Sequence, residues 1–188
     1  MSILELISAR KSIRAFQDRS IDESDLLRLF EAARWAPSSR NEQPWRFISA
    51  RKEDRESFEK MLAALNETNR SWARHASALI LVVAKTRFTD SDIPNTHALY
   101  DTGMAVANLS LQATALNISL HQLGGFHSAM AGELFHVPQG FEPVVMIALG
   151  YQGNPESLPE PFRSREGMPR KRKSLEEFHF TKLFGENH

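Results

Sequence analysis

The sequence predicts a layered α/β (α+β) domain that ends in an irregular C-terminal arm. Helical patterns alternate along the chain with about four strand-like segments, which is typical of layered domains. From about residue 151 onwards the chain is too irregular to form a core element. A chain of 188 residues buries roughly 70% of the surface that its unfolded form exposes. We therefore expect one domain over residues 1–188, with residues 151–188 as an extended arm.

The first third of the chain is expected to be mainly helical. Ile3–Arg10 has apolar residues at positions 3, 4, 6 and 7, as a short amphipathic helix does. The next helix should begin at Ser20 as its N-cap, with Glu23 as the capping-box partner, and end before Pro37. A short strand and another amphipathic helix are expected to follow at Arg46–Ala50 and Glu53–Leu65.

The middle of the chain contains the most apolar segments. Ala78–Ala84 is rich in Val, Leu and Ile and is predicted to be a strand covered on both faces. Thr96–Asn117 is the longest helical pattern, and it has few charges beyond Asp101, so we expect it to be buried. Two more strands are expected at Ile118–Leu123 and Val144–Leu149.

Charge and composition exclude several classes of function. Lys plus Arg equals Asp plus Glu, at 23 each, so no global field attracts nucleic acid or an anionic membrane. The chain has no cysteine, so any redox chemistry must reside in a bound cofactor. Glu5 interrupts the apolar start that a signal peptide needs, and Ala78–Ala84 is too short to span a bilayer. We expect a cytoplasmic protein without nucleic-acid or membrane partners.

Two basic segments near opposite ends of the chain suit a phosphate group. Arg10-Lys11-Ser12-Ile13-Arg14 offers three cations and a hydroxyl within five residues, as a phosphate monoester requires. A solvated basic turn is the alternative. The run Arg170-Lys171-Arg172-Lys173 fits a phosphate site, a solvated charge run or a nucleic-acid patch, of which the neutral overall charge disfavours the last.

Two loops have the composition of ligand-binding segments. The segment Pro37–Phe47 is rich in hydroxyl and amide side chains and leads through Pro44-Trp45 into a strand. An ordinary connection between helix and strand explains it equally well. In Leu123-Gly124-Gly125-Phe126, two glycines would let a flat ligand approach the backbone closely, although most such pairs are turns.

Searches for other catalytic signatures find nothing. The seven histidines lack metal-ligand spacing, and there is no phosphate-binding P-loop. The dinucleotide fingerprint G-x-G-x-x-G and the serine-hydrolase pattern G-x-S-x-G are absent as well. We therefore expect no metal, and no nicotinamide held by a Rossmann fold.

Taken in order, these segments resemble the FMN-dependent nitroreductase family. The resemblance begins with Arg10–Arg14 and the Pro37–Phe47 loop. It continues on the long helix with Asp101-x-Gly103-x-Ala105-x-x-Asn108-Leu109-x-Leu111, then with Gly124-Gly125-Phe126, Pro143–Gly150 and Arg170–Lys173. It covers nearly the whole chain.

The resemblance implies a three-layer α-β-α fold around a mixed, largely antiparallel sheet. It also implies a homodimer whose FMN sites are shared between subunits. The ribityl phosphate would be held by residues from both ends of the chain: Arg10, Lys11, Ser12, Arg170 and Arg172. The partner subunit would contribute Pro37, Ser38, Ser39 and Asn41.

The resemblance also places residues around the flavin ring. Arg14 would lie near N1 and O2, and Asn69 would contact the pyrimidine edge. The Gly124 N–H would point at N5, and the same edge would be lined by Gln122, Leu123 and Gly125. No side chain would act as the catalyst, because the flavin performs the hydride chemistry while Gly124 and Arg14 tune it.

The implied activity is a ping-pong transfer of hydride from NADH or NADPH through FMN to a nitroaromatic, quinone or similar small acceptor. A related flavin enzyme acting on an enone or halogenated substrate, or a flavin carrier or sensor without turnover, is the alternative. Two residues depart from the family pattern: Lys11 replaces an Arg or His, and Trp72 stands where some members have a Lys. Trp72 would make the face over the ring more apolar.

Overall fold

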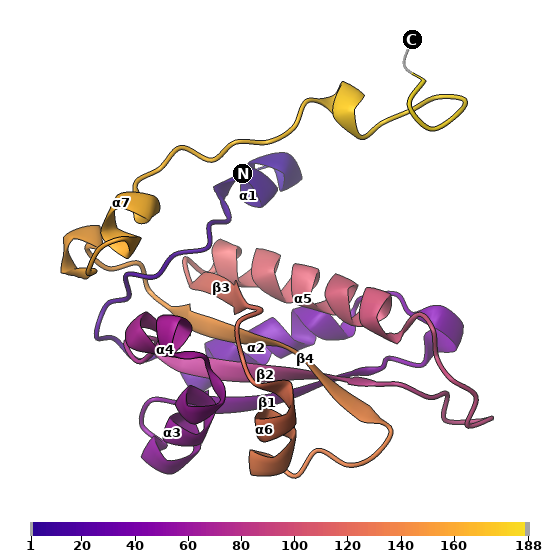
Figure 1. Ribbon diagram of the computed structural model, residues 1–188, viewed down its shortest axis with the longest axis horizontal. Helices are drawn as coiled ribbons and strands as arrows, with labels where there is room; N and C mark the ends of the chain where they lie inside the picture. Colours follow the sequence, from indigo (N-terminus) through magenta and orange to yellow (C-terminus); the bar gives the residue numbers. More distant parts are fainter. Residues whose placement is uncertain (1, 187–188) are drawn as a thin grey trace.

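The computed structural model describes residues 2–186 and has three layers, with a sheet between two layers of helices (Figure 1). The four strands lie in the order β1-β2-β4-β3, and they are Trp45–Arg51 (β1), Ala78–Lys85 (β2), Ser119–Leu123 (β3) and Phe141–Gly150 (β4). The prediction of a layered α+β fold is confirmed. Every pairing in this described sheet is antiparallel, which agrees with the expected largely antiparallel sheet, and no parallel pairing occurs among these four strands.

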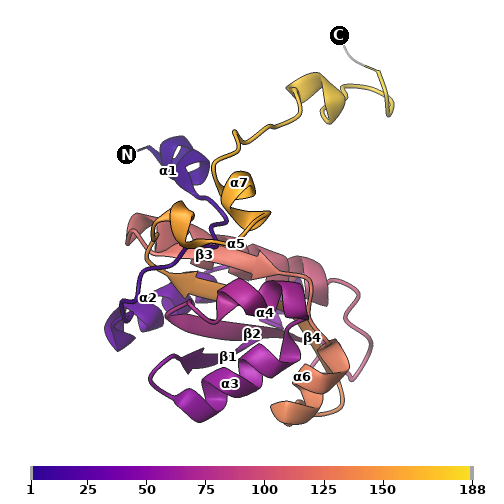
Figure 2. The same ribbon diagram turned by 60° about the vertical axis from the view of Figure 1, so that its left-hand side comes forward.

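The helices divide between the two faces of the sheet (Figure 2). One face is covered by α3 (Arg55–Ala64), α4 (Glu67–Ala73) and α6 (Ser128–Leu134). The other face is covered by α2 (Glu23–Arg34) and α5 (Ala98–Ala115). Two short helices, α1 (Ile3–Ala9) and α7 (Phe162–Glu166), lie near the ends of the chain.

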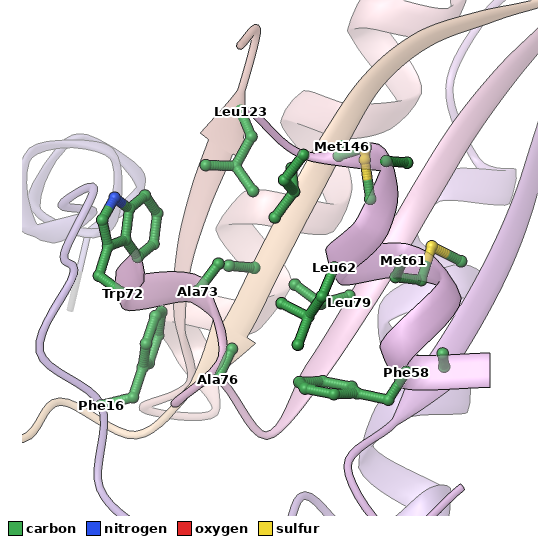
Figure 3. Packing of buried hydrophobic residues seen from close by; sticks show 14 of the residues in the cluster. Phe16, Phe58, Met61, Leu62, Trp72, Ala73, Ala76, Leu79, Leu123 and Met146 are labelled. Carbon is green, nitrogen blue, oxygen red and sulfur yellow. The ribbon is translucent and has the colours of Figure 1, made fainter. Parts of the chain in front are cut away.

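Strand β2 is the centre of both cores, as its apolar sequence predicts. Successive side chains of a strand point to opposite faces, so the strand serves both cores in alternation. Leu79, Leu81 and Val83 pack with α3 and α4, while Ala78, Ile80 and Val82 pack with α2 and α5. Figure 3 shows the first of these cores, where Phe58 and Met61 of α3 lie around Leu79.

The long helix α5 is buried along one face only. Ala105 and Leu109 are fully buried against α2, where Leu29 lies. At its start, however, Leu99 and Tyr100 are 51% and 71% exposed. The core of the domain therefore buries most of the apolar surface of this helix, and an apolar pair stays on the outside.

Helix α2 does not begin as predicted. Its N-cap is Asp22, and the Ser20 hydroxyl donates to the carboxylate of Glu53 instead. The capping-box prediction of Ser20 with Glu23 was wrong because a carboxylate distant in sequence competes for the hydroxyl. A capping box does occur in α1, between Ser2 and Glu5.

The C-terminal part of the chain first packs on the body and then leaves it. Leu158 and Phe162 are 6% and 9% exposed. From Gly167 onwards nearly every described residue is exposed, and the chain runs away from the sheet (Figure 1). Helix α1 contacts α5 but has no buried residue. None of the helices among residues 2–186 is long and apolar enough to cross a membrane.

Candidate functional site

The two basic segments, 160 residues apart in sequence, meet in the structure. The Arg170 guanidinium donates to the backbone carbonyls of Arg10, at 2.6 Å, and of Ser8. Arg10 in turn donates from Nη1 to the Ser12 hydroxyl at 3.2 Å. Burial, together with the charges of Arg170 and then Arg172, lowers the pKa of Arg10. Converging cations that repel one another favour an anionic ligand, and a phosphate dianion matches this donor set.

Lys11 is exposed and belongs to the same group of residues, which we call the basic cluster: Arg10, Lys11, Ser12, Arg170 and Arg172. Together with Arg10 it borders a hollow of about 460 Å³. Its ammonium keeps the positive charge of the basic segment, although it lacks the planar donors of an arginine.

Arg14 is held at the inner end of the same segment by Glu166 of α7. Glu166 Oε1 accepts hydrogen bonds from the backbone N–H groups of Arg14, at 2.6 Å, and Ala15, at 3.1 Å. Glu166 Oε2 lies 3.5 Å from Arg14 Nη1, and the two side chains are 5% and 24% exposed. The Arg14 guanidinium also lies 5.8 Å from the ring centres of Trp72 and Phe162. Arg14 is therefore fixed in backbone and side chain.

Trp72 lies beneath this site instead of facing it. Its side chain is 1% exposed and packs 4.7 Å from the ring of His121. The expectation that Trp72 makes the face over a ligand more apolar was wrong, because the indole belongs to the core. Its Nε1, which Figure 3 shows turned away from Phe16, has no hydrogen-bond partner among the described residues.

His121 links this core to the basic segment. Its Nδ1 donates to the Ile13 carbonyl at 2.8 Å. Burial is the main cause that lowers the pKa of His121, which keeps the ring neutral at physiological pH. A neutral, partly buried imidazole beneath the site supports the backbone of residue 13.

The Gly124-Gly125 pair and the start of α4 form a second part of the site. Asn69 Nδ2 donates to the Gly125 carbonyl at 3.0 Å, and the Asn66 N–H donates to the same oxygen at 3.2 Å. A Cβ atom at Gly125 would lie 2.4 Å from Asn66 Nδ2, so only glycine fits without a shift. A Cβ at Gly124 would meet nothing within 4 Å. The exposed Gly124 therefore faces open space, where a flat ligand can approach.

The two residues before the glycines differ in what they offer a ligand. Gln122 is exposed at the end of β3. Leu123 is 1% exposed and points into the core (Figure 3), so only its backbone faces the site.

The Pro37–Asn41 loop lies apart from these residues within one chain. Its Ser39 N–H donates to the buried Asp101 of α5 at 2.9 Å. Its Ser38 hydroxyl accepts from the Gln43 N–H at 2.9 Å. No hydrogen bond or ion pair of the described residues joins the loop to the basic cluster or to the glycine pair. The predicted site residues therefore form two groups in a single subunit.

The backbone of this loop is strained. Arg40, Asn41 and, just after the loop, Gln43 have φ angles of 53°, 54° and 49°. Residues other than glycine adopt such positive φ angles at a cost of about 1–3 kcal/mol each. The Arg40 guanidinium lies 4.5 Å from the ring centre of Phe88. Strain of this kind concentrates at binding and catalytic sites.

The sequence did not reveal Glu166, Asn66 or His121 as site residues. Asn66 carried a usable signal, because Asn before a helix is a favoured N-cap and its side chain accepts from the Asn69 N–H. Glu166 carried none, since its partners are backbone groups more than 150 residues away.

Comparison with known proteins agrees with this geometry. Residues 7–151 match the model of the nitroreductase family. A protein of Archaeoglobus fulgidus, provisionally named an NADH dehydrogenase/NAD(P)H nitroreductase, is 35% identical over 152 residues, which are 79% of this chain and 84% of its own.

Solved structures match as well. An oxidoreductase described as containing FMN shares 32% identity with a TM-score of 0.92, covering 100% of this chain and 95% of its own. A nitroreductase family protein from Clostridium difficile shares 25% identity with a TM-score of 0.77, covering 97% and 99%. The chain therefore belongs to the nitroreductase family.

Proposed function

We propose that the protein is an FMN-dependent oxidoreductase that transfers hydride from NADH or NADPH to a nitroaromatic, quinone or similar small acceptor in a ping-pong reaction. The observation that carries this proposal is the convergence of Arg10, Arg170 and Arg172, because mutually repelling guanidinium groups suit a phosphate monoester. The description of a relative with 32% identity as an FMN-containing oxidoreductase supports it further. Bound FMN would supply N5 as the atom that accepts and donates hydride.

The phosphate end of the cofactor would be held by the basic cluster, Arg10, Lys11, Ser12, Arg170 and Arg172. Their donors match the three oxygens of a phosphate, and Arg10 and Arg172 would lose their mutual repulsion on binding it.

The ring end would lie against Arg14, Asn69 and the Gly124 edge. The cation of Arg14 favours negative charge at N1 and O2, which the reduced flavin carries. Asn69 donates to Gly125, and its Oδ1 accepts no hydrogen bond from the described residues, which leaves it for an N–H of the pyrimidine edge. The open space beside the Cα of Gly124 leaves room for the ring. The Gly124 N–H would meet N5 there, with Gln122, Leu123 and Gly125 beside it.

A homodimer would complete each site, with Pro37, Ser38, Ser39 and Asn41 coming from the partner subunit. The separation of this loop from the basic cluster within one chain supports this arrangement. Exposed apolar side chains on α1, on the start of α5 and on the arm would be covered in a dimer: Ile3, Leu4, Leu99, Tyr100, Leu175 and Phe178. Stable dimers of this kind bury ~2,000 Å² or more.

Other acceptors, such as an enone or a halogenated compound, and a carrier or sensor role without turnover are the alternative functions. The cytoplasmic location, the single-domain organisation over residues 1–188 and the arm over residues 151–188 remain predictions from the sequence.

The proposal is tested by the flavin that the protein retains. Purified protein should be yellow, and heating should release FMN and not FAD, because the basic cluster suits a terminal phosphate monoester. Release of FAD alone, or no flavin uptake after incubation with FMN, would contradict it. A carrier or sensor would bind FMN but would not be reduced by NADH or NADPH at a useful rate.

A further inference from the structure

The segment that follows α1 and the segment that follows α7 run side by side in opposite directions (Figure 2). Two sets of hydrogen bonds, which we call the outer and the inner rung, join them. The outer rung is exposed and consists of Arg170 with the carbonyls of Ser8 and Arg10. The inner rung consists of Glu166 with the N–H groups of Arg14 and Ala15. The outer rung carries the basic cluster, and the inner rung carries Arg14.

The inner rung is built as a buried charge pair. The Glu166 side chain is 5% exposed, and the Arg14 guanidinium is the cation that lies within ion-pair distance of it. Removing the side chain would leave two backbone N–H groups without their acceptor and a half-buried guanidinium without its counter-charge. From Gly167 to residue 186 nearly all described residues are exposed, so this outer part of the arm has few contacts of its own to hold it.

We propose that Glu166 is a positioning residue with two effects, an inference that rests on the proposed FMN site. Through the inner rung it fixes the start of the arm, so that Arg170 and Arg172 reach the phosphate. The positive charge of Arg14 favours the anionic reduced flavin, and the negative charge of Glu166 offsets part of it. Glu166 therefore makes the flavin harder to reduce than Arg14 alone would. A residue that merely braced the arm would have no such effect.

Two substitutions separate these effects. Glu166→Gln keeps an oxygen that accepts from the Arg14 and Ala15 N–H groups but removes the charge. Glu166→Ala removes both the oxygen and the charge. Glu160→Gln is the matched control, because Glu160 precedes α7 in the same segment and its exposed carboxylate accepts from Arg163 and Ser164 of α7 without contacting Arg14. Gln keeps an accepting oxygen for Ser164 and removes only the charge.

Glu166→Ala should loosen the arm and weaken cofactor binding. In the flavin-free protein, trypsin should cleave after Arg163 and Arg165 about tenfold faster, because α7 loses its anchor. The Kd for FMN should rise about tenfold or more, as expected for loss of hydrogen bonds to a charged group.

Glu166→Gln should bind oxidised FMN about as tightly as the wild type but bind reduced FMN about threefold more tightly, which makes the reduction potential more positive. Glu160→Gln should change neither the affinity for FMN nor the reduction potential. A Glu166→Ala protein with the tryptic rate and FMN affinity of the wild type would overturn the anchoring role. Flavin-loaded Glu166→Gln with an unchanged potential would overturn the charge role. Wild-type protein without affinity for FMN would overturn the proposed function itself, while the tryptic rates would still report on the anchor.

Discussion

We expect Arg10→Ala to weaken FMN binding strongly without weakening the fold. The basic cluster would act as a phosphate clamp, in which its charged side chains hold the FMN phosphate. Arg10 lies with Arg170 and Arg172, and the charged donors of this cluster would each contact a phosphate oxygen. A hydrogen bond to a charged group contributes about 1.5–3 kcal/mol, so the Kd for FMN should rise roughly 10- to 150-fold. Riboflavin lacks the phosphate, and its Kd should change much less.

Arg10→Ala should not lower the stability of the flavin-free protein, although it weakens FMN binding. Folding lowers the pKa of Arg10, through burial and then through the charges of Arg170 and Arg172. A base whose pKa is lower in the folded state destabilises that state wherever the base is charged, which for arginine includes the whole neutral pH range. Arg10→Ala removes this penalty, so the Tm of the flavin-free variant should be unchanged or higher.

Fluorescence titration of flavin-free protein with FMN and with riboflavin measures both constants. Lys173→Ala is the matched control, because it removes one charge from the same arm at an exposed position outside the proposed clamp. Equal losses of FMN and riboflavin affinity in Arg10→Ala, accompanied by a lower Tm, would refute the clamp and show that Arg10 is structural.

Three further predictions concern the ring, the glycine pair and the dimer. Arg14→Met should lower the reduction potential of bound flavin by some tens of millivolts, where ~30 mV corresponds to about 1.4 kcal/mol; an unchanged potential would mean that Arg14 does not face N1. Gly125→Ala should lower the free energy of unfolding by about 1–3 kcal/mol in chemical denaturation because its Cβ meets Asn66 and Asn69, whereas Gly124→Ala should leave the flavin-free fold intact. In sedimentation at decreasing protein concentration, flavin should travel with the dimer and be lost as monomer forms; a monomer that keeps FMN would contradict the shared site.

The parts of the fold that the sequence predicted well are those with a long or uniform pattern. The seven apolar residues Ala78–Ala84 have no polar face and are rich in Val, Leu and Ile, which favours a central strand covered on both sides. Thr96–Asn117 has the length and periodicity of a helix, and α5 lies within two residues of each predicted end.

Short elements and their boundaries were less predictable. Helices α4 and α6 have seven residues each and were not predicted. Neither has the four large apolar residues that mark the equally short α1, and Trp72 and Ala131 are instead held by the core around them. The predicted N-cap of α2 was wrong because the Ser20 hydroxyl donates to Glu53 in the folded chain.

The site could be predicted only in pieces. Arg10–Arg14 and Arg170–Arg172 each have a composition that suits phosphate, but nothing local shows that they meet, and the resemblance to a family was needed to bring them together. The role of Glu166 could not be predicted, because it accepts from two backbone N–H groups, which carry no sequence signal, and pairs with Arg14, which is 152 residues away in sequence.

The central claim is that the protein is reduced by a nicotinamide and reoxidised by a small acceptor through one FMN. It is tested most directly by following the flavin absorbance under anaerobic conditions. Stoichiometric NADH or NADPH should bleach the oxidised flavin, and after the nicotinamide is removed, a quinone or nitroaromatic should restore the absorbance in full. FMN that stays oxidised in the presence of both nicotinamides would contradict the account.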